Sequence, residues 1–474
     1  MTQVSTRRIY RKLKHRPVRI LHRQRSAGRT LVAAAPEAPS VILLVGDPPA
    51  DWLEWAVTEL PDGVTPGAHY LDGNTVVLRY KTPDGPVEIH EASMWFGEGC
   101  GAADATHAYE ALQEVIGRAF DGATILATPA TTGRELFLRT IPREVEYPVL
   151  DAETQDLIRA TDGQGRIEVV NPFDTHAKAA WDMHAERYAL EELHEYDARF
   201  AYAALCWELP TGPVHHDDVN RYEGQMRGRY KVAGMVPRDW SEPFGLLGEK
   251  DNAGGWRYPH APGEHFQTWC DGAELHVALQ QGWKVEILER LLFPTVGRPL
   301  DTWAKKLVAA RASTDNELVR TALRNILLQA VGAFHGRQHI ETHMVRVEDA
   351  ERVPSNARRP RRGGPGKEWI VYGLETGQGW ANLAHPEWSA CIWGRGRARL
   401  LSAPKSQGAL NREPGTHVVG FRTDAIYLTG AQPEWDAADD GAPGRYRSKG
   451  SLRTRSAWPR NSRELLELKA AMDA

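Results

Sequence analysis

The most constraining feature of this sequence is an apolar segment that turns sharply at one aspartate and continues as a second apolar segment. It occupies residues 419–430 and reads VGFRTDAIYLTG, with Asp424 in the polar turn. Two apolar runs joined by a tight turn predict a β-hairpin, which holds the carboxylate at its tip, where it can bind a divalent metal. A second run, at residues 196–203, reads YDARFAYA and places Asp197 at the end of a strand-like stretch. Two strand-end aspartates from distant parts of the chain predict one two-metal site.

These segments resemble palm motifs of the family B DNA polymerases, and most closely those of the protein-primed branch found in phages and linear plasmids. The first palm motif of that family reads D-x-x-S-L-Y-P, and Asp197 and Tyr202 match its aspartate and its tyrosine. The last palm motif reads D-T-D-S between two apolar strands. Asp424 keeps its second aspartate, whereas Arg422 stands where the first would be.

A third segment, between these two, resembles the fingers motif K-x-x-x-N-S-x-Y-G of the same family. Residues 324–332 read RNILLQAVG, in which only the basic Arg324 and Gly332 match the motif. The three segments follow the order of the family, and the resemblance covers roughly residues 190 to 455.

The resemblance implies an α+β fold. Its parts would be a polymerase palm (an antiparallel sheet with helices), small helical fingers, a reduced thumb, and an N-terminal α/β domain that is RNase H-like or accessory. The expected segments are a flexible basic arm (1–35), the N-terminal domain (36–150), the palm with the first motif (151–300), the fingers helices (301–340), the palm with the last motif (341–430) and the thumb (431–474).

The implied activity is template-directed DNA synthesis with two Mg2+ ions, or Mn2+, held by Asp197 and Asp424. In the family, the tyrosine that Tyr202 matches lies under the sugar of the incoming nucleotide and excludes a 2′-hydroxyl; a core tyrosine is the alternative. The implied partners are a DNA template and primer, dNTPs, and a terminal protein or another replication protein.

Basic residues near the motifs are candidates for phosphate contacts. Arg320 and Arg324 lie one helical turn apart and can cradle a triphosphate, with a solvated basic face as the alternative. Lys449, in the basic, glycine-containing stretch 444–450, resembles the family's lysine at the primer terminus, although a plain surface lysine would look the same. Thr423, Arg397 and Arg445 are further candidates for DNA contact.

The periodicity of the sequence predicts most of the other elements. Expected strands cover residues 40–45, 75–80, 124–128, 229–237, 266–269 and 285–293. Expected helices cover 106–118, 271–281, 301–312, 315–332 and a final segment from 462. Residues 356–367 are expected to form a surface loop. Arginines at 395, 397 and 399 alternate with small residues, which predicts a strand with one basic face; an ordinary solvated face is the alternative to a phosphate contact there.

Arg422 is the departure from the family that most affects the expected activity. A guanidinium next to the metals would weaken their binding by Coulomb repulsion. Residues 422 and 424 share a face in a regular strand, but a turn breaks that rule. Two hypotheses follow: an active polymerase, or a polymerase-derived protein that has lost catalysis and binds DNA as a replication or terminus factor. A nuclease that uses the same acids is a third.

Composition sets outer bounds on the fold and partners. With 474 residues, 42% of them hydrophobic, the chain can bury a large core in two or three domains. The net charge of -4 shows no general excess of positive charge, but residues 1–30 are basic and acid-free, and the first carboxylate is Glu37. This stretch predicts a disordered tail, a phosphate-gripping arm or a transit peptide.

Four widely spaced cysteines without a C-x-x-C pair favour a reducing cytoplasm. No apolar run reaches the ~20 residues that a membrane helix needs, so no membrane is expected.

Several other motifs are given structural interpretations. The D-x-E pair Asp151 and Glu153 comes too late in the chain for an exonuclease, and Asp151 is expected to cap a helix, so proofreading is not expected. Residues 128–134 lack the Gly-Lys-Ser/Thr of a P-loop. The HHDD run at 215–218 is expected in a solvated loop, and the histidines at 335, 339 and 343 are expected to be structural.

Overall fold

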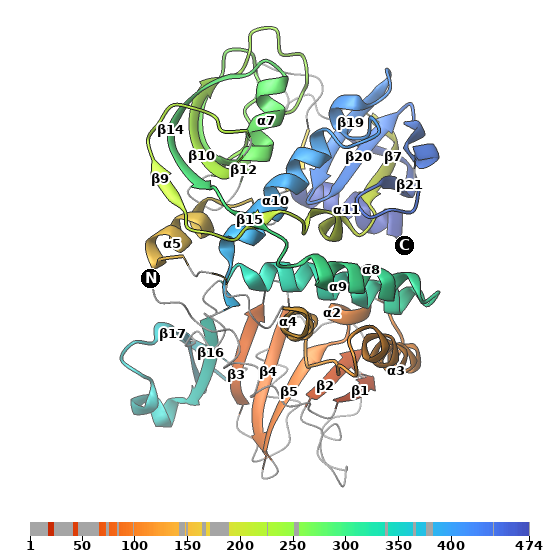
Figure 1. Cartoon of the computed structure of the whole chain (residues 1–474). Helices are drawn as coiled ribbons and strands as arrows, with labels where there is room; N and C mark the ends of the chain where they lie inside the picture. Colours follow the sequence, from red (N-terminus) through yellow and green to blue (C-terminus); the bar gives the residue numbers. More distant parts are fainter. Residues whose placement is uncertain are drawn as a thin grey trace. The chain divides into compact units, whose positions relative to one another are not determined.

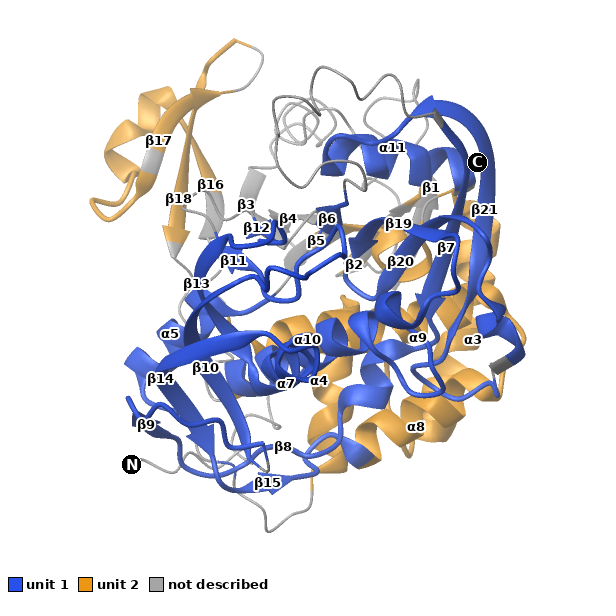
Figure 2. Cartoon of the chain, turned by 90° about the horizontal axis from the view of Figure 1, so that it is seen from above, with its two compact units in different colours: residues 1–3, 146–301, 385–474 blue, residues 4–145, 302–384 orange. Residues whose placement is uncertain are grey.

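The computed structural model shows two compact units (Figures 1 and 2). It describes residues 18–22, 41–45, 66–72, 75–82, 85–97, 99–141, 147, 150–163, 167–170, 189–224, 226–250, 256–336, 340–363, 366–375, 383–438 and 440–473. Unit 1 takes its described residues from 146–301 and 385–474, and unit 2 from 4–145 and 302–384. No helix in these ranges is long and apolar enough to cross a membrane.

Unit 2 contains an eight-stranded sheet in the order β1-β2-β5-β4-β3-β16-β18-β17. β1 is parallel to β2 and β2 to β5, and all other neighbours are antiparallel. In chain order the strands are β1 (Val18–His22), β2 (Val41–Val45), β3 (Pro66–Asp72), β4 (Thr75–Thr82), β5 (Gly85–Glu91), β16 (Ile340–Arg346), β17 (Arg358–Gly363) and β18 (Trp369–Glu375).

The helices of unit 2 are α2 (Ser93–Phe96), α3 (Ala102–Ala119), α4 (Pro129–Thr140), α8 (Asp301–Ala312) and α9 (Glu317–Phe334), with a 3-10 turn η5 (Val347–Arg352). The apolar side of α9 is buried, and α2, α3 and α4 pack against this helix. α4 lies so close to α9 at Gly133 that a Cβ there would collide with Ala330 and with the carbonyl of Ile326.

The predicted strands at 40–45 and 75–80 and the predicted helices at 106–118, 301–312 and 315–332 are confirmed in unit 2, with small shifts of their ends. Asn316 caps α9: its side chain accepts from the N–H groups of Leu318 and Val319. Two predictions are wrong, because residues 124–128 form no strand and the arginine-rich segment 356–367 contains β17.

Unit 1 is built on antiparallel sheets. A five-stranded sheet has the order β21-β7-β20-β19-β6 and a four-stranded sheet the order β13-β10-β14-β9, with two short pairs, β11-β12 and β15-β8. In chain order the strands are β6 (Ile167–Val169), β7 (Ala189–Ala198), β8 (Leu209–Pro210), β9 (His215–Asp217), β10 (Arg227–Met235), β11 (Glu249–Lys250), β12 (Trp256–Arg257), β13 (His265–Asp271), β14 (Lys284–Phe293), β15 (Val296–Gly297), β19 (Thr416–Arg422), β20 (Ala425–Gly430) and β21 (Tyr446–Ala457).

Helices cover these sheets. They are α5 (Ala152–Thr161), α7 (Gly272–Gln280), α10 (Pro386–Leu401) and α11 (Ser462–Asp473), with 3-10 turns η4 (Ala201–Leu205), η7 (Ala409–Asn411) and η8 (Glu434–Ala438). As predicted, Asp151 caps α5. Asp271 caps α7 in a capping box, and Gly282 follows α7 with a φ of 80°.

Side chains alternate between the two faces of the five-stranded sheet, as the period of two in a strand requires. On one face, Tyr196 and Ile426 belong to the large core that also contains Leu400 of α10. On the other face, Leu193 and Tyr427 pack with Leu465 of α11. The sheet is therefore covered on both sides.

The structure corrects two sequence predictions in unit 1. The segment with arginines at 395, 397 and 399 is not a strand but part of α10, which is buried along most of its length. Its glycines, which disfavour helices, allow close packing: a Cβ on Gly394 would collide with Asp271 at the start of α7. His215–Asp217 is the edge strand β9, not a loop, and Asp217 forms an ion pair with Arg290.

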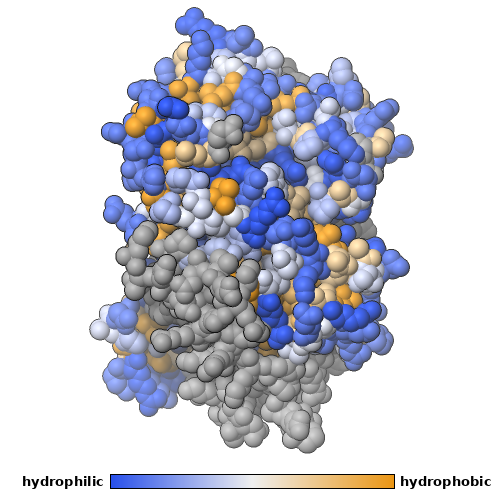
Figure 3. Space-filling view, viewed as in Figure 1, coloured by the Kyte–Doolittle hydropathy of each residue, from blue (hydrophilic) through white to orange (hydrophobic). Residues whose placement is uncertain are grey.

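The described residues on the face shown in Figure 3 are largely hydrophilic, with apolar side chains scattered among polar ones. The exposed large hydrophobic residues are Trp207, Val219, Met226, Met235 and Val296.

Candidate functional site

Asp197 and Asp424 lie at the same end of the five-stranded sheet, on neighbouring antiparallel segments. Asp197 of β7 is directly opposite Ala425 of β20. The N–H of Ala198 donates to the carbonyl of Asp424, at 3.4 Å. The antiparallel register thus brings together two aspartates from distant parts of the sequence.

The turn that carries Asp424 is a two-residue loop, because Arg422 pairs with Ala425 across the hairpin. Thr423 has a φ of 51°, a left-handed conformation that is unusual for a β-branched residue. Its hydroxyl lies 2.9 Å from Oδ1 of Asp424 and can donate to it. Strained backbone of this kind is concentrated at functional sites. The turn therefore holds a largely buried carboxylate in one position at the tip of the hairpin.

The charges of Asp197 and Asp424 both affect the ionisation of one buried tyrosine, Tyr446. The pKa of Tyr446 lies well above its ordinary value, first because the residue is fully buried and then because the charges of Asp424 and Asp197 disfavour a phenolate. Arg399 and Arg397 act in the opposite direction. Both acids are therefore close enough to the first residue of β21 to influence its charge.

Lys449 lies on the same end of the sheet. Its Nζ is 3.5 Å from Oδ2 of Asp197 and 3.6 Å from Oε1 of Glu195. The Lys449 side chain is 40% exposed, which leaves it accessible from solvent. Arg445, just before β21, pairs with Asp440 at 3.2 Å, and its carbonyl accepts from the N–H of Arg199.

Arg422 lies on the face of the sheet that carries Asp197. The residues in register form one row across four strands, in the order Arg447, Asp197, Ala425 and Arg422. Burial, and then the charge of Glu195, raise the pKa of Tyr427, and the nearby charge of Arg422 opposes this shift. Asp424 is in the turn, beyond the regular strand. Arg422 is therefore a neighbour of Asp197 with only a small alanine between them.

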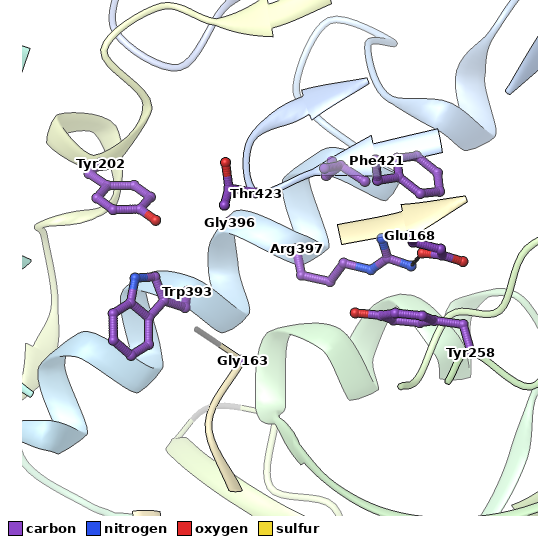
Figure 4. Close-up of a pocket in the computed structure, with 10 residues that line it drawn as sticks. Gly163, Glu168, Tyr202, Tyr258, Trp393, Gly396, Arg397, Phe421 and Thr423 are labelled. Atoms are coloured by element: carbon purple, nitrogen blue, oxygen red, sulfur yellow. Dashed lines mark ion pairs between the residues drawn. The ribbon is translucent and has the colours of Figure 1, made fainter. Parts of the chain in front are cut away.

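A pocket opens beside this end of the sheet, within unit 1 (Figure 4). Figure 4 shows the hydroxyls of Tyr202 and Tyr258 pointing toward its middle from opposite sides. The lining residues are Gly163, Glu168, Tyr202, Tyr258, Trp393, Gly396, Arg397, Leu400, Phe421 and Thr423. Two residues predicted from the motifs, Tyr202 and Thr423, line this pocket together.

Arg397 forms part of the pocket wall and is only 4% exposed. Its guanidinium is 2.9 Å from the Glu168 carboxylate and donates to the carbonyl of Gly245 at 3.0 Å. It also lies over the rings of Tyr258 and Phe421. The predicted exposed basic strand is therefore absent here, and we leave Arg397 out of the proposed DNA contacts.

The remaining predicted nucleotide-binding residues, Arg320, Arg324 and Gly332, lie on α9 of unit 2. Arg320 donates to the carbonyl of Thr314 at 2.7 Å and pairs with Asp315 at 3.0 Å. Arg324 is one helical turn further on and partly buried. Arg320 also pairs with Glu317 at 2.5 Å, so its guanidinium is held by groups at the start of its own helix.

The histidines with helical spacing do not form a cluster in the part of the chain that is described. His335 is buried at the end of α9, His343 stacks on Tyr372 in the sheet of unit 2, and His339 lies outside the described residues. The described residues contain no group of three or more His, Cys, Asp or Glu side chains suited to a metal ion.

Two aspartates fit Mg2+ better than they fit most other metals. Mg2+ prefers hard oxygen ligands, keeps several waters, and is usually held by one or two carboxylates together with substrate phosphates. Asp197, on β7, and Asp424, in the turn before the neighbouring strand β20, supply two such carboxylates. The residues present are therefore compatible with a metal that binds together with a nucleotide.

Sequence comparison finds no protein family whose profile matches the chain and no curated protein that is similar to it. Solved structures are similar in fold. Phi29 DNA polymerase complexed with primer-template DNA, a post-translocation binary complex, has a TM-score of 0.52 and 12% identity, over 87% of this chain and 76% of that one.

Two other structures of the same enzyme give similar values. The complex with single-stranded DNA has a TM-score of 0.51 and 12% identity, over 88% of this chain and 76% of that one. The ternary complex with primer-template DNA and incoming nucleotide substrates has a TM-score of 0.50 and 12% identity, over 80% of this chain and 69% of that one. The chain therefore has a polymerase-like mixed α/β fold with antiparallel sheets, similar to that of Phi29 DNA polymerase.

Proposed function

We propose that this protein is a template-directed DNA polymerase of family B type, which transfers nucleotides from dNTPs to a primer hydroxyl. The observation that carries the proposal is the position of Asp197 at the end of β7 beside Asp424 in the turn before β20, within a fold similar to that of a DNA polymerase. The solved complexes contain primer-template DNA or single-stranded DNA, and one contains incoming nucleotides. We propose the same kinds of partner for this chain.

The acids and the lysine have distinct roles in this proposal. Asp197 and Asp424 would hold two Mg2+ ions, or Mn2+, which supply activation of the primer hydroxyl and charge neutralisation at the triphosphate. Lys449, whose side chain reaches Asp197, would contact the primer terminus. Thr423 and Arg445, on either side of these acids, would contact DNA.

Tyr202, in the pocket wall of unit 1, would lie under the sugar of the nucleotide. In unit 2, the resemblance makes Arg320, Arg324 and Gly332 of α9 candidates for phosphate contacts. Proofreading is not part of the proposal, and a terminal protein or another replication protein is a proposed partner because of the resemblance to the protein-primed branch.

Primer extension tests this proposal directly. Purified protein, Mg2+, dNTPs and a primed template are expected to give products whose sequence is dictated by the template. A product whose length or sequence is independent of the template would reject the polymerase activity.

A second candidate function is DNA binding without catalysis. Arg422 and Arg447 flank Asp197 in the row across the sheet, so positive charge lies close to the proposed metal site. Such charge suits a phosphate backbone and disfavours a metal. Salt-sensitive DNA binding without extension, in either Mg2+ or Mn2+, would favour this candidate.

Replacing Tyr202 with valine is expected to raise ribonucleotide incorporation relative to deoxyribonucleotide incorporation by about tenfold or more, a difference of ~1.4 kcal/mol. A ring under the sugar excludes a 2′-hydroxyl by contact, and valine removes that contact. The measurement is single-nucleotide kcat/KM for each nucleotide type. Tyr222→Val, which alters a tyrosine of the same unit outside the pocket lining, is the matched control. Unchanged selectivity in an active Tyr202→Val enzyme would remove Tyr202 from the site.

A further inference from the structure

Two acids on β7 share two lysines from the C-terminal part of the chain. Glu195 and Asp197 are two residues apart in a strand and therefore lie on the same face. The Glu195 side chain is 3% exposed, and its Oε2 lies 2.6 Å from Nζ of Lys469 in α11. Lys449 then bridges Glu195 and Asp197, at 3.6 Å and 3.5 Å. The four charges form a continuous network of alternating sign.

A β-bulge places Lys449 in this network. Ser448 pairs with Tyr196 and Gly450 pairs with Glu195, so Lys449 is an extra residue between two paired ones. A bulge redirects the side chain of the residue that it adds. In a regular strand the side chains would alternate, whereas here the Lys449 ammonium is directed to both acids of β7.

We infer that Lys449 is an internal counter-ion for Asp197, which a divalent metal must displace, so that Lys449 sets the metal affinity of this site. The inference rests on the metal-binding role proposed for Asp197. An ammonium 3.5 Å from the Asp197 carboxylate repels a cation that approaches the same oxygens. Glu195 holds Lys449 from the other side and offsets part of its charge. When a metal arrives bound to a nucleotide, the phosphates carry negative charge, and Lys449 therefore repels the complex less than it repels the free metal.

Direct metal binding tests the inference in the absence of DNA and nucleotide. Mn2+ is titrated into the protein, and free Mn2+ is measured by electron paramagnetic resonance. Lys449→Met removes the charge and keeps most of the length of the side chain, so Mn2+ is expected to bind about tenfold more tightly than in the wild type, the order expected for one nearby charge. Glu195→Gln removes one negative charge from the network, so Mn2+ is expected to bind more weakly by a similar factor.

Two more variants complete the series. Lys405→Met removes an exposed lysine of the same unit that pairs with Asp440, and it is expected to leave Mn2+ affinity unchanged. Lys469→Met is expected to strengthen binding less than Lys449→Met does, because its ammonium contacts Glu195. It also provides a second network variant if Glu195→Gln does not fold.

Thermal unfolding gives an independent readout. A ligand that binds only the folded state stabilises it by RT ln(1 + [L]/Kd), so at one ligand concentration a tighter ligand raises the melting temperature more. Mn2+ is therefore expected to raise the melting temperature of Lys449→Met more than that of the wild type, relative to the same proteins in a chelator.

The inference is overturned by equal Mn2+ affinities in the wild type and Lys449→Met, by absence of Mn2+ binding in both, or by a shift of the same sign in Lys449→Met and Glu195→Gln. Its failure is distinguishable from failure of the proposed function. The predicted order of affinities in a protein that extends no primer supports the inference and rejects the polymerase. Primer extension by a protein whose Mn2+ affinity is independent of Lys449 supports the polymerase and rejects the inference.

Discussion

Replacing Asp197 with asparagine is expected to slow primer extension by about a thousandfold or more. The change keeps the size of the side chain but removes the charge that would hold a metal. Metal ions contribute several kcal/mol of charge stabilisation to phosphoryl transfer, and each 1.36 kcal/mol corresponds to a factor of ten in rate. The measurement is the single-turnover rate of extension at saturating dNTP.

Asp424→Asn is expected to have an effect of similar size, and the double variant little more than either, because the two acids would act as one unit. Asp239→Asn, which changes an exposed aspartate of the same structural unit, is the control and is expected to match the wild type. Wild-type extension by Asp197→Asn would exclude the proposed site.

Replacing Arg397 with methionine is expected to lower the free energy of unfolding by about 3–5 kcal/mol, the usual cost of breaking a buried ion pair by removing one partner. Glu168, whose side chain is 8% exposed, would lose this guanidinium as a counter-ion. The carbonyl of Gly245 would lose a donor as well. Urea unfolding monitored by tryptophan fluorescence measures the change.

Two variants separate this structural role from a DNA contact. Arg453→Met, at an exposed position of β21, is expected to change stability by no more than about 0.5 kcal/mol. Adding Glu168→Gln to Arg397→Met is expected to restore part of the loss, because no unpaired charge then remains buried. Unchanged stability together with weakened DNA binding in Arg397→Met would instead support the contact that the sequence pattern suggested.

Arg397 also shows where the sequence analysis could not succeed. Arginine and small residues alternate at 395–399, which is a strand pattern, and glycine disfavours helices. In the structure, tertiary packing outweighs both signals: Gly394 lets α10 approach the start of α7, and Arg395 and Arg397 donate to interior carbonyls. A local pattern does not reveal that a helix will be buried on nearly every side.

The hairpin at Asp424 was predictable because all of its determinants are local. Continuous apolar runs lie on both sides, and the polar turn is short, so β19 and β20 form where the pattern indicates. Asp197 and Tyr202 could be predicted only as parts of a spaced motif. Their partners in the site, among them Tyr258, Trp393 and Glu168, arrive through long-range topology and carry no motif of their own. Trp393 could have been found if α10 had been recognised as a helix.

The order of strands in the five-stranded sheet has a consequence for how unit 1 is made during synthesis. Both neighbours of β7, which are β20 and β21, come from the last part of the chain. Until residues 425–457 have been synthesised, β7 has two open edges, and such edges pair readily with other chains. Long-range pairing of this kind also makes folding slow. A nascent chain that stops before β20 would therefore be prone to aggregate and would lack the paired strands around Asp197.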